Sequence, residues 1–203
     1  MMAFITLCWR RTRADLSALF VCALCWGAPV QAEPARVDIA PIELQRNGDS
    51  VELATTLAFE LPAIVHDALS KGVPVTFVAE AEVYRERWYW FEKRVGAAQR
   101  QLRLVYQPLT RRWRVSSGAG ETGAALAQSF DTLDDALGVV RRISGWRIAA
   151  ISELEADSPY RVDFRFRLDT SRLPRPLQIG TLGESDWVLA ASASRAFASR
   201  SLK

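Results

Sequence analysis

Cysteine is missing from most of this 203-residue chain, and histidine occurs only once. The three cysteines, Cys8, Cys22 and Cys25, all lie near the N-terminus, so residues 33–203 can form no disulfide and contain no thiol nucleophile. The lone His66 has no cysteine or second histidine with which to complete a metal site. These absences exclude cysteine-based catalysis and a Cys- or His-based metal centre there, and we expect no bound cofactor.

A long hydrophobic run is also lacking after the N-terminus. The run from Leu16 to Trp26 follows Arg10, Arg11 and Arg13, and it is shorter than the roughly 20 residues that span a bilayer. Because Val30-Gln31-Ala32 suits a signal peptidase, residues 1–32 are predicted to be a signal peptide that is cleaved after Ala32. We therefore expect a periplasmic protein without a transmembrane segment. An uncleaved N-terminal anchor is the alternative.

Residues 33–203 carry little excess charge of either sign. The net charge of +3 depends on three arginines and one aspartate in residues 1–32, which leaves residues 33–203 nearly neutral. A nearly neutral exported chain argues against nucleic acid as a partner. No internal repeat or linker is visible, so residues 33–203 are predicted to form a single β-rich domain with a loose C-terminal tail.

Alternation of apolar and polar residues is the main pattern in this part of the chain. The clearest case runs from Tyr160 to Leu168, where Phe164 and Phe166 alternate with Arg165 and Arg167. Asn47-Gly48 between two alternating segments predicts a hairpin, and Pro41 predicts a break in its first strand. Strands are predicted over residues 37–44, 51–59, 73–84, 84–95, 102–106, 113–115, 146–151, 160–168 and 187–193.

Two segments have helical spacing instead. One runs from Leu61 to the terminator Gly72, and the other begins at the cap Thr132 and ends at Gly145. Few helices and many one-sided strands favour a mainly β fold, an antiparallel β-sandwich of about seven to nine strands with two short helices. The alternative is an α+β fold with one antiparallel sheet and both helices on one face.

Candidate binding residues fall into an aromatic and a basic group. The aromatic strand contains Trp88, Tyr89, Trp90 and Phe91, so an aromatic pair stands on each of its faces and one pair must meet a second layer, a ligand or a partner. The basic clusters are Arg111, Arg112 and Arg114, and Arg141, Arg142 and Arg147. Such clusters can bind a phosphate, an anionic lipid head group or an acidic strip on a partner. The alternative is that they lie at a solvent-exposed turn and at a helix end, where they bind nothing.

A catalytic interpretation has less support, and we name no catalytic residue. Glu80, Glu82, Glu86 and Glu92 lie nearest the aromatic strand, where two acids with tryptophan platforms are typical of glycoside cleavage. Opposite charges across a sheet normally pair, so Glu80 and Glu82 are expected to find Arg103, Arg114, Arg165 or Arg167. A structure that pairs both glutamates with arginines would remove the hydrolase hypothesis.

Several segments together resemble a known family. They are AEVYRERWYWFEKRV, YQPLTRRWRV, the helix start FDTLDDAL and the run FRFRLDTSRLPRPLQ. The chain resembles, from about Val37 to Ala193, exported proteobacterial proteins classed as domain of unknown function 4390 and sometimes labelled proline-rich signal peptide proteins. The resemblance implies no activity or cofactor. It implies an accessory role in signalling, because members tend to lie beside an envelope sensor kinase and a response regulator.

These observations favour a non-catalytic exported binding or accessory module of the cell envelope, linked to a sensor-kinase system. The expected partner is an envelope protein or a small anionic or sugar ligand. The alternatives are an envelope hydrolase that uses carboxylates near the aromatic strand and a structural subunit of an envelope complex.

Overall fold

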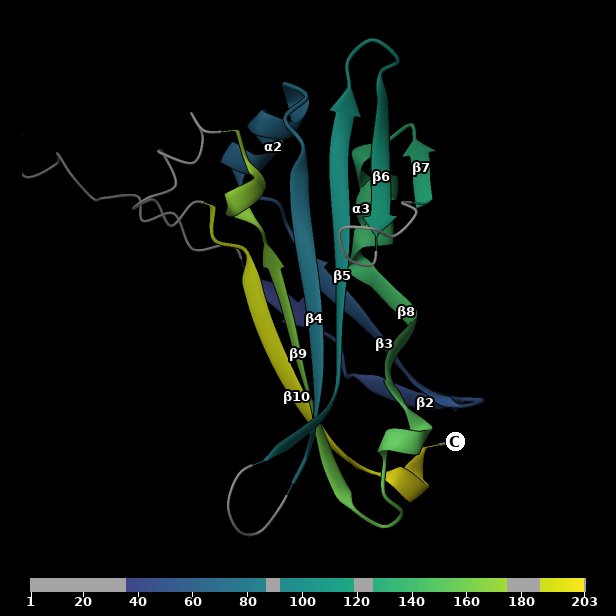
Figure 1. Cartoon of the computed structure of the whole chain (residues 1–203). Helices are drawn as coiled ribbons and strands as arrows, with labels where there is room; N and C mark the ends of the chain where they lie inside the picture. The colour runs from purple at the N-terminus through teal and green to yellow at the C-terminus, as the bar shows by residue number, and fades with distance from the viewer. Residues whose placement is uncertain (1–35, 87–91, 119–125, 175–186, 203) are drawn as a thin grey trace, which may run out of the picture. The chain divides into compact units, whose positions relative to one another are not determined.

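Antiparallel strands dominate the computed structural model, which describes residues 36–86, 92–118, 126–174 and 187–202 (Figure 1). Residues 33–203 form one compact unit. The described residues hold ten strands: β1 (Val37–Ile39), β2 (Glu43–Asn47), β3 (Ser50–Phe59), β4 (Val75–Arg85), β5 (Lys93–Gln107), β6 (Arg112–Gly118), β7 (Leu126–Phe130), β8 (Arg142–Ala150), β9 (Pro159–Leu168) and β10 (Ala190–Ala198). They also hold the helices α2 (Ala63–Ser70) and α3 (Leu133–Arg141), and the short 3₁₀ turns η1 (Ile151–Glu153), η2 (Thr170–Arg172) and η4 (Ser199–Ser201).

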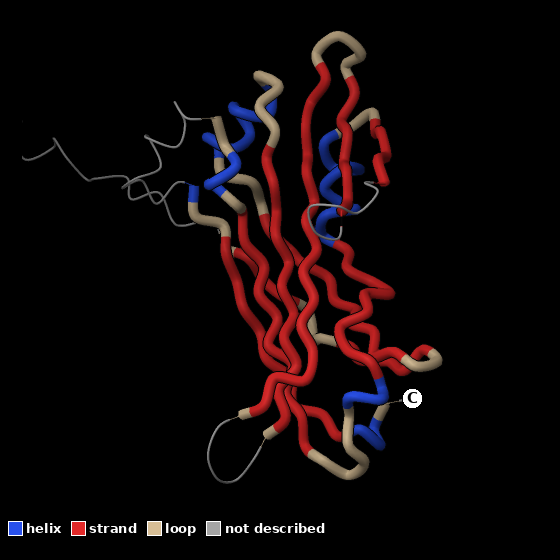
Figure 2. Tube along the Cα trace, in the orientation of Figure 1, coloured by secondary structure: helices blue, strands red, loops and turns tan. Residues whose placement is uncertain are grey.

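The strands form two sheets, which Figure 2 shows as two red layers. One has six strands in the order β10-β9-β4-β5-β6-β7, and the other places β1, β2 and β8 around β3. Because β2 and β8 both pair with residues 50–54 of β3, they must flank it on opposite edges. The predicted mainly β antiparallel fold is confirmed. Its ten described strands exceed the expected seven to nine in part because β1 and β2 are separate.

The apolar faces of the two sheets meet in one core. Phe77 of β4 and Phe166 of β9 stack at 5.8 Å between ring centroids, and Phe59 of β3 lies 5.5 Å from Phe166. Phe164 and Phe166 are buried whereas Arg165 and Arg167 are exposed, as the alternation in this segment predicted. Burial of one face of each sheet therefore explains why these strands pack in two layers.

The first hairpin forms as predicted, with a turn one residue later than Asn47-Gly48. Asn47 pairs with Ser50, so the turn residues are Gly48 and Asp49, and Gly48 takes the positive φ of 56° that favours glycine. The predicted break falls between β1 and β2, which Pro41 separates.

Helix α3 is capped as predicted but is shorter. The Thr132 hydroxyl accepts a hydrogen bond from the backbone N–H of Asp135 at 3.1 Å. The prediction that Gly145 ends this helix was wrong, because the chain leaves the helix after Arg141 and continues directly as β8. Ile143 pairs with Thr55 of β3, and Gly145 adopts a φ of 55° at a register shift within β8.

The C-terminal part of the described chain is more regular than expected. Instead of a loose tail after Ala193, β10 continues to Ala198 and pairs with β9 as far as Pro159. The ring of Phe197 stacks on that of Tyr160 at 5.5 Å, which explains why the strand continues. Trp187 and Leu189, predicted to begin this strand, lie before it and are buried.

Candidate functional site

The aromatic quartet Trp88, Tyr89, Trp90 and Phe91 lies outside the described residues, and its proposed binding role stays a prediction. The chain is described again from Glu92, immediately after the quartet. The candidate site therefore has to be built from the charged residues of the sheet.

The outward side of the six-stranded sheet, which we call the polar face, carries Glu80 and Glu82 of β4. Strand register identifies the other residues on this face, because paired residues share a side and every second residue repeats it. Glu80 pairs with Arg165 of β9 and Gln99 of β5. Continuing along these strands and their neighbours places the following residues on the same face: Arg161, Asp163, Arg167, Ser192, Ser194, Arg103, Arg112, Arg114 and Ser129.

The predicted cluster of Arg111, Arg112 and Arg114 is partly divided by the turn before β6. Arg111 lies in this turn with a φ of 53°, whereas Arg112 and Arg114 point to the polar face. Arg112 binds a carboxylate oxygen of Asp131 at 3.0 Å. Arg114 pairs in register with Val105, which places it diagonally across from Arg103 on the neighbouring strand. Two exposed arginines are therefore brought together by the β5–β6 hairpin.

Glu80 and Glu82 both have arginine partners, although only one partner was among those expected. Arg167 donates to Glu80 at 3.1 Å, and Arg94 donates to Glu82 at 2.9 Å. The Tyr84 hydroxyl also donates to Glu82 at 2.9 Å. The pairing of Glu80 with Arg167 follows the prediction, whereas Arg94 was not anticipated because it lies beyond the bulge near Val83.

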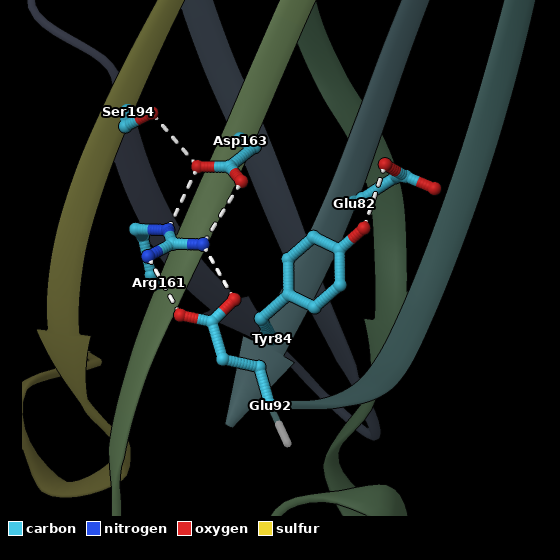
Figure 3. A network of polar contacts seen from close by, with 6 residues as sticks. All are labelled: Glu82, Tyr84, Glu92, Arg161, Asp163 and Ser194. Carbon is cyan, nitrogen blue, oxygen red and sulfur yellow. Dashed lines mark hydrogen bonds and ion pairs between the residues drawn. The ribbon is translucent and has the colours of Figure 1, made fainter. Parts of the chain in front are cut away.

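A second network lies beside Glu82 and Tyr84 on the same face, because Glu82 pairs in register with Asp163 and Tyr84 with Arg161 (Figure 3). Arg161 binds both carboxylate oxygens of Glu92 at 2.9 and 2.8 Å, and its Nε donates to Asp163 at 3.0 Å. Ser194 of β10 donates to the same Asp163 oxygen at 2.7 Å. This arrangement ties β9 to β10 through Asp163 and to Glu92, just before β5, through the bidentate Arg161.

Hydrogen bonds shift three protonation equilibria in this region. The bonds from Arg94 and Tyr84 stabilise the ionised form of Glu82 and lower its pKa below the ordinary 4.5. The bond to Glu82 raises the pKa of the Tyr84 hydroxyl, and bonds to Glu92 and Asp163 raise the pKa of Arg161. A glutamate with a lowered pKa holds no proton near neutral pH, so Glu82 is unsuited to act as a general acid.

Three arginines of the polar face have no acidic partner within the described parts of the chain. Arg103, Arg114 and Arg165 are exposed, and none of the described carboxylates forms an ion pair with them. Arg165 lies close enough to Glu82 to lower its pKa through charge alone. The polar face therefore carries a surplus of positive charge along β5, β6 and β9.

Two open hollows mark the surface. One of about 270 Å³ lies on the polar face and is lined by Glu80, Glu82, Ala97, Ala98, Gln99 and Arg165. The other, of about 470 Å³, lies between β5 and β8 and is lined by residues 94–97, residues 147–150 and Glu153. Small-molecule sites usually bury most of their ligand, whereas both of these hollows are open to solvent.

The remaining candidates stand apart from the polar face. His66 is exposed on α2, and the described residues contain no group of His, Cys, Asp or Glu able to hold a metal ion. Arg141 donates to the backbone oxygen of Phe59 at 2.9 Å, while Arg142 and Arg147 are exposed on β8. No helix of the described chain is long and apolar enough to cross a membrane.

Comparison with known proteins adds one finding. Residues 35–196 match the model of a protein family described as Domain of unknown function (DUF4390), which confirms the resemblance seen in the sequence. No curated protein and no solved structure matches the chain.

Proposed function

Because the chain belongs to this family, whose description assigns no activity, we propose from its geometry that it is a non-catalytic, exported binding or accessory module of the cell envelope. Its docking surface is the polar face, and its partner is an envelope protein that presents an acidic strip. The observation that carries this proposal is a set of exposed arginines, Arg103, Arg114 and Arg165, that form no ion pair with any carboxylate of the described residues.

The charge pattern favours a protein partner over a substrate. Charges that are unpaired on an exposed face cost little in water, yet they steer an oppositely charged surface and fix its orientation. A row of arginines on neighbouring strands matches an acidic strip better than a single small anion. The family resemblance implies that the module acts as an accessory protein of an envelope sensor kinase.

The hydrolase alternative finds little support in the same geometry. Glu80 is paired with Arg167, and Glu82 is paired with Arg94 and bonded to Tyr84. Glycoside cleavage by two carboxylates needs one of them protonated at working pH, whereas the arginine and tyrosine bonds lower the pKa of Glu82. Ion pairing with arginine therefore accounts for Glu80 and Glu82 better than a catalytic role does.

Charge removal on the polar face tests the proposal. We would compare the tagged wild-type chain with the double variant Arg103→Ser/Arg114→Ser in pull-downs from detergent-solubilised envelopes. The double variant Arg46→Ser/Arg142→Ser is the matched control, because it removes two exposed arginines from the four-stranded sheet. Proteins held by the polar face should be lost with the first variant and kept with the control.

Salt dependence separates an electrostatic docking module from a structural subunit. Binding through exposed arginines should weaken strongly at about 1 M salt, where charges are screened beyond about 3 Å. Equal recovery of the same proteins with both double variants would contradict the proposal. A complex that survives high salt unchanged would favour the structural-subunit alternative.

The export part of the proposal has its own test. The chain recovered from the periplasmic fraction should begin at Glu33 by N-terminal sequencing, since the expected cleavage follows Ala32. A chain that retains Met1 and sediments with membranes would instead support the uncleaved anchor.

A further inference from the structure

The free edges of the two sheets differ in how well they are protected against pairing with another chain. An edge strand presents unpaired N–H and C=O groups, and proteins usually protect such edges with short strands, bulges or charged side chains. In the described part of the chain the edge strands are β10 and β7 of the six-stranded sheet, and β1, β2 and β8, each of which pairs only with β3.

Four of these edge strands carry a protective feature, and β1 is the shortest of them with three residues. Strands β2 and β7 have five residues each, and β2 also holds the charged Glu43 and Arg46. Strand β8 has nine residues, but its pairing with β3 is irregular twice and it contains Gly145 at positive φ. Arg142 and Arg147 add charge along β8. Each of these edges is a poor template for a further strand.

Strand β10 has none of these features except one charge. Its nine residues, AASASRAFA, include no proline or glycine, and they pair with β9 without a register shift from Ala190 to Ala198. Figure 1 shows β10 as the outermost strand of its sheet. Strand β1 of the other sheet lies near it, but no backbone hydrogen bond joins the two. The β10 edge is therefore long, regular and open.

The side chains near this edge indicate what kind of segment would fit. On the polar face β10 carries only small residues, Ala190, Ser192, Ser194 and Ala196. Ser192 pairs with Arg165 of β9, which has no acidic partner among the described residues. Arg165 lines the hollow with Glu80 and Glu82, but arginine is long and serine is short, so the Arg165 side chain can turn across Ser192 toward a side chain on the far side of β10.

We propose that the free edge of β10 binds an extended segment of another protein by strand addition, with an acidic side chain of that segment facing Arg165. Backbone hydrogen bonds supply affinity in this mode, and alternate side chains supply specificity. A second copy of the chain fits less well, since β10 contains no aspartate or glutamate to pair with Arg165. This site shares Arg165 with the surface of the proposed function but involves neither Arg103 nor Arg114.

Two peptides as long as β10 test this inference. Both have nine residues and blocked ends, with glutamate alternating with valine in one and lysine alternating with valine in the other. The readout is hydrogen exchange of the β10 amides in the full chain with and without each peptide. The glutamate peptide should slow exchange at alternate β10 residues by about tenfold, and the lysine peptide should not.

Two substitutions locate the effect. Ser192→Asp offers Arg165 a carboxylate within the chain and should weaken binding of the glutamate peptide by about tenfold. Ser129→Asp makes the same change on β7, the opposite edge of the same face, and should leave binding unchanged. Ala190→Asp, opposite Arg167, replaces Ser192→Asp as the test if the latter does not fold by circular dichroism.

Several outcomes would overturn the inference. They are protection by neither peptide, equal protection by both, or equal loss of binding in the Ser192→Asp and Ser129→Asp variants. Protection that appears on β7 instead of β10 would do the same. So would concentration-dependent dimerisation of the peptide-free chain through β10 in analytical ultracentrifugation, because it would assign the edge to a second copy.

Discussion

A close approach of β5 to β8 makes Gly96 an informative position for a stability test. A Cβ atom at Gly96 would lie 2.7 Å from the backbone oxygen of Ile148 and 2.8 Å from the Cβ of Ala149. Both distances are well below ordinary contact, and the first involves backbone, so β5 or β8 would have to move. Over-packing of this kind costs about 1–3 kcal/mol. Gly96→Ala should lower the free energy of unfolding by that amount.

The same substitution at Gly138 should have the opposite effect, which makes it the matched control. Gly138 lies on the exposed side of α3, and a Cβ there meets nothing within 4 Å. Replacing glycine by alanine inside a helix stabilises by about 0.5–1 kcal/mol. Urea unfolding measures both changes, and each 1 kcal/mol corresponds to about 2–4 °C in Tm. A Gly96→Ala variant as stable as the wild type would refute the close packing of β5 on β8.

Two further predictions concern the core and the polar face. Phe166→Ala should destabilise by about 3–5 kcal/mol in urea unfolding, because the ring is buried against Phe59 and Phe77; a loss below about 1 kcal/mol would contradict the two-layer core. The pKa of Glu82 is lowered in the folded protein, so this residue stabilises the fold above its ordinary pKa of 4.5, and that stability is lost as the pH falls through the folded pKa. Arg94→Gln should therefore make the free energy of unfolding depend less on pH in the acid range. An unchanged pH dependence in that range would contradict the bond between Arg94 and Glu82.

The sequence predicted local structure well where one face of a strand had to be buried. The alternation from Tyr160 to Leu168 specified β9 and its orientation, since a one-residue slip would have placed arginines in the core. The Thr132 cap could also be predicted, because its hydrogen bond joins residues only three positions apart. These features depend on near neighbours in the chain.

Features set by distant parts of the chain were missed. Gly145 resembles a helix terminator in sequence, yet pairing with β3 makes it a bulge residue in β8. Arg103 and Arg114 are separated by a turn, so only the register of the β5–β6 hairpin shows that they lie diagonally across from each other on one face. The open edge of β10 likewise depends on which strand comes last in the sheet, a property that no short segment encodes.

The central position of β4 also affects the order in which the molecule can assemble. Phe77 of β4 pairs with Leu168 of β9, and β10 then pairs on β9. Until the last third of the chain has left the ribosome, β4 therefore lacks one of its two neighbours and Phe77 lacks its aromatic contact with Phe166. Sheets closed by such distant contacts fold slowly. A nascent chain halted before β9 thus remains unfinished and open to chaperones, because its central strand is still missing a neighbour.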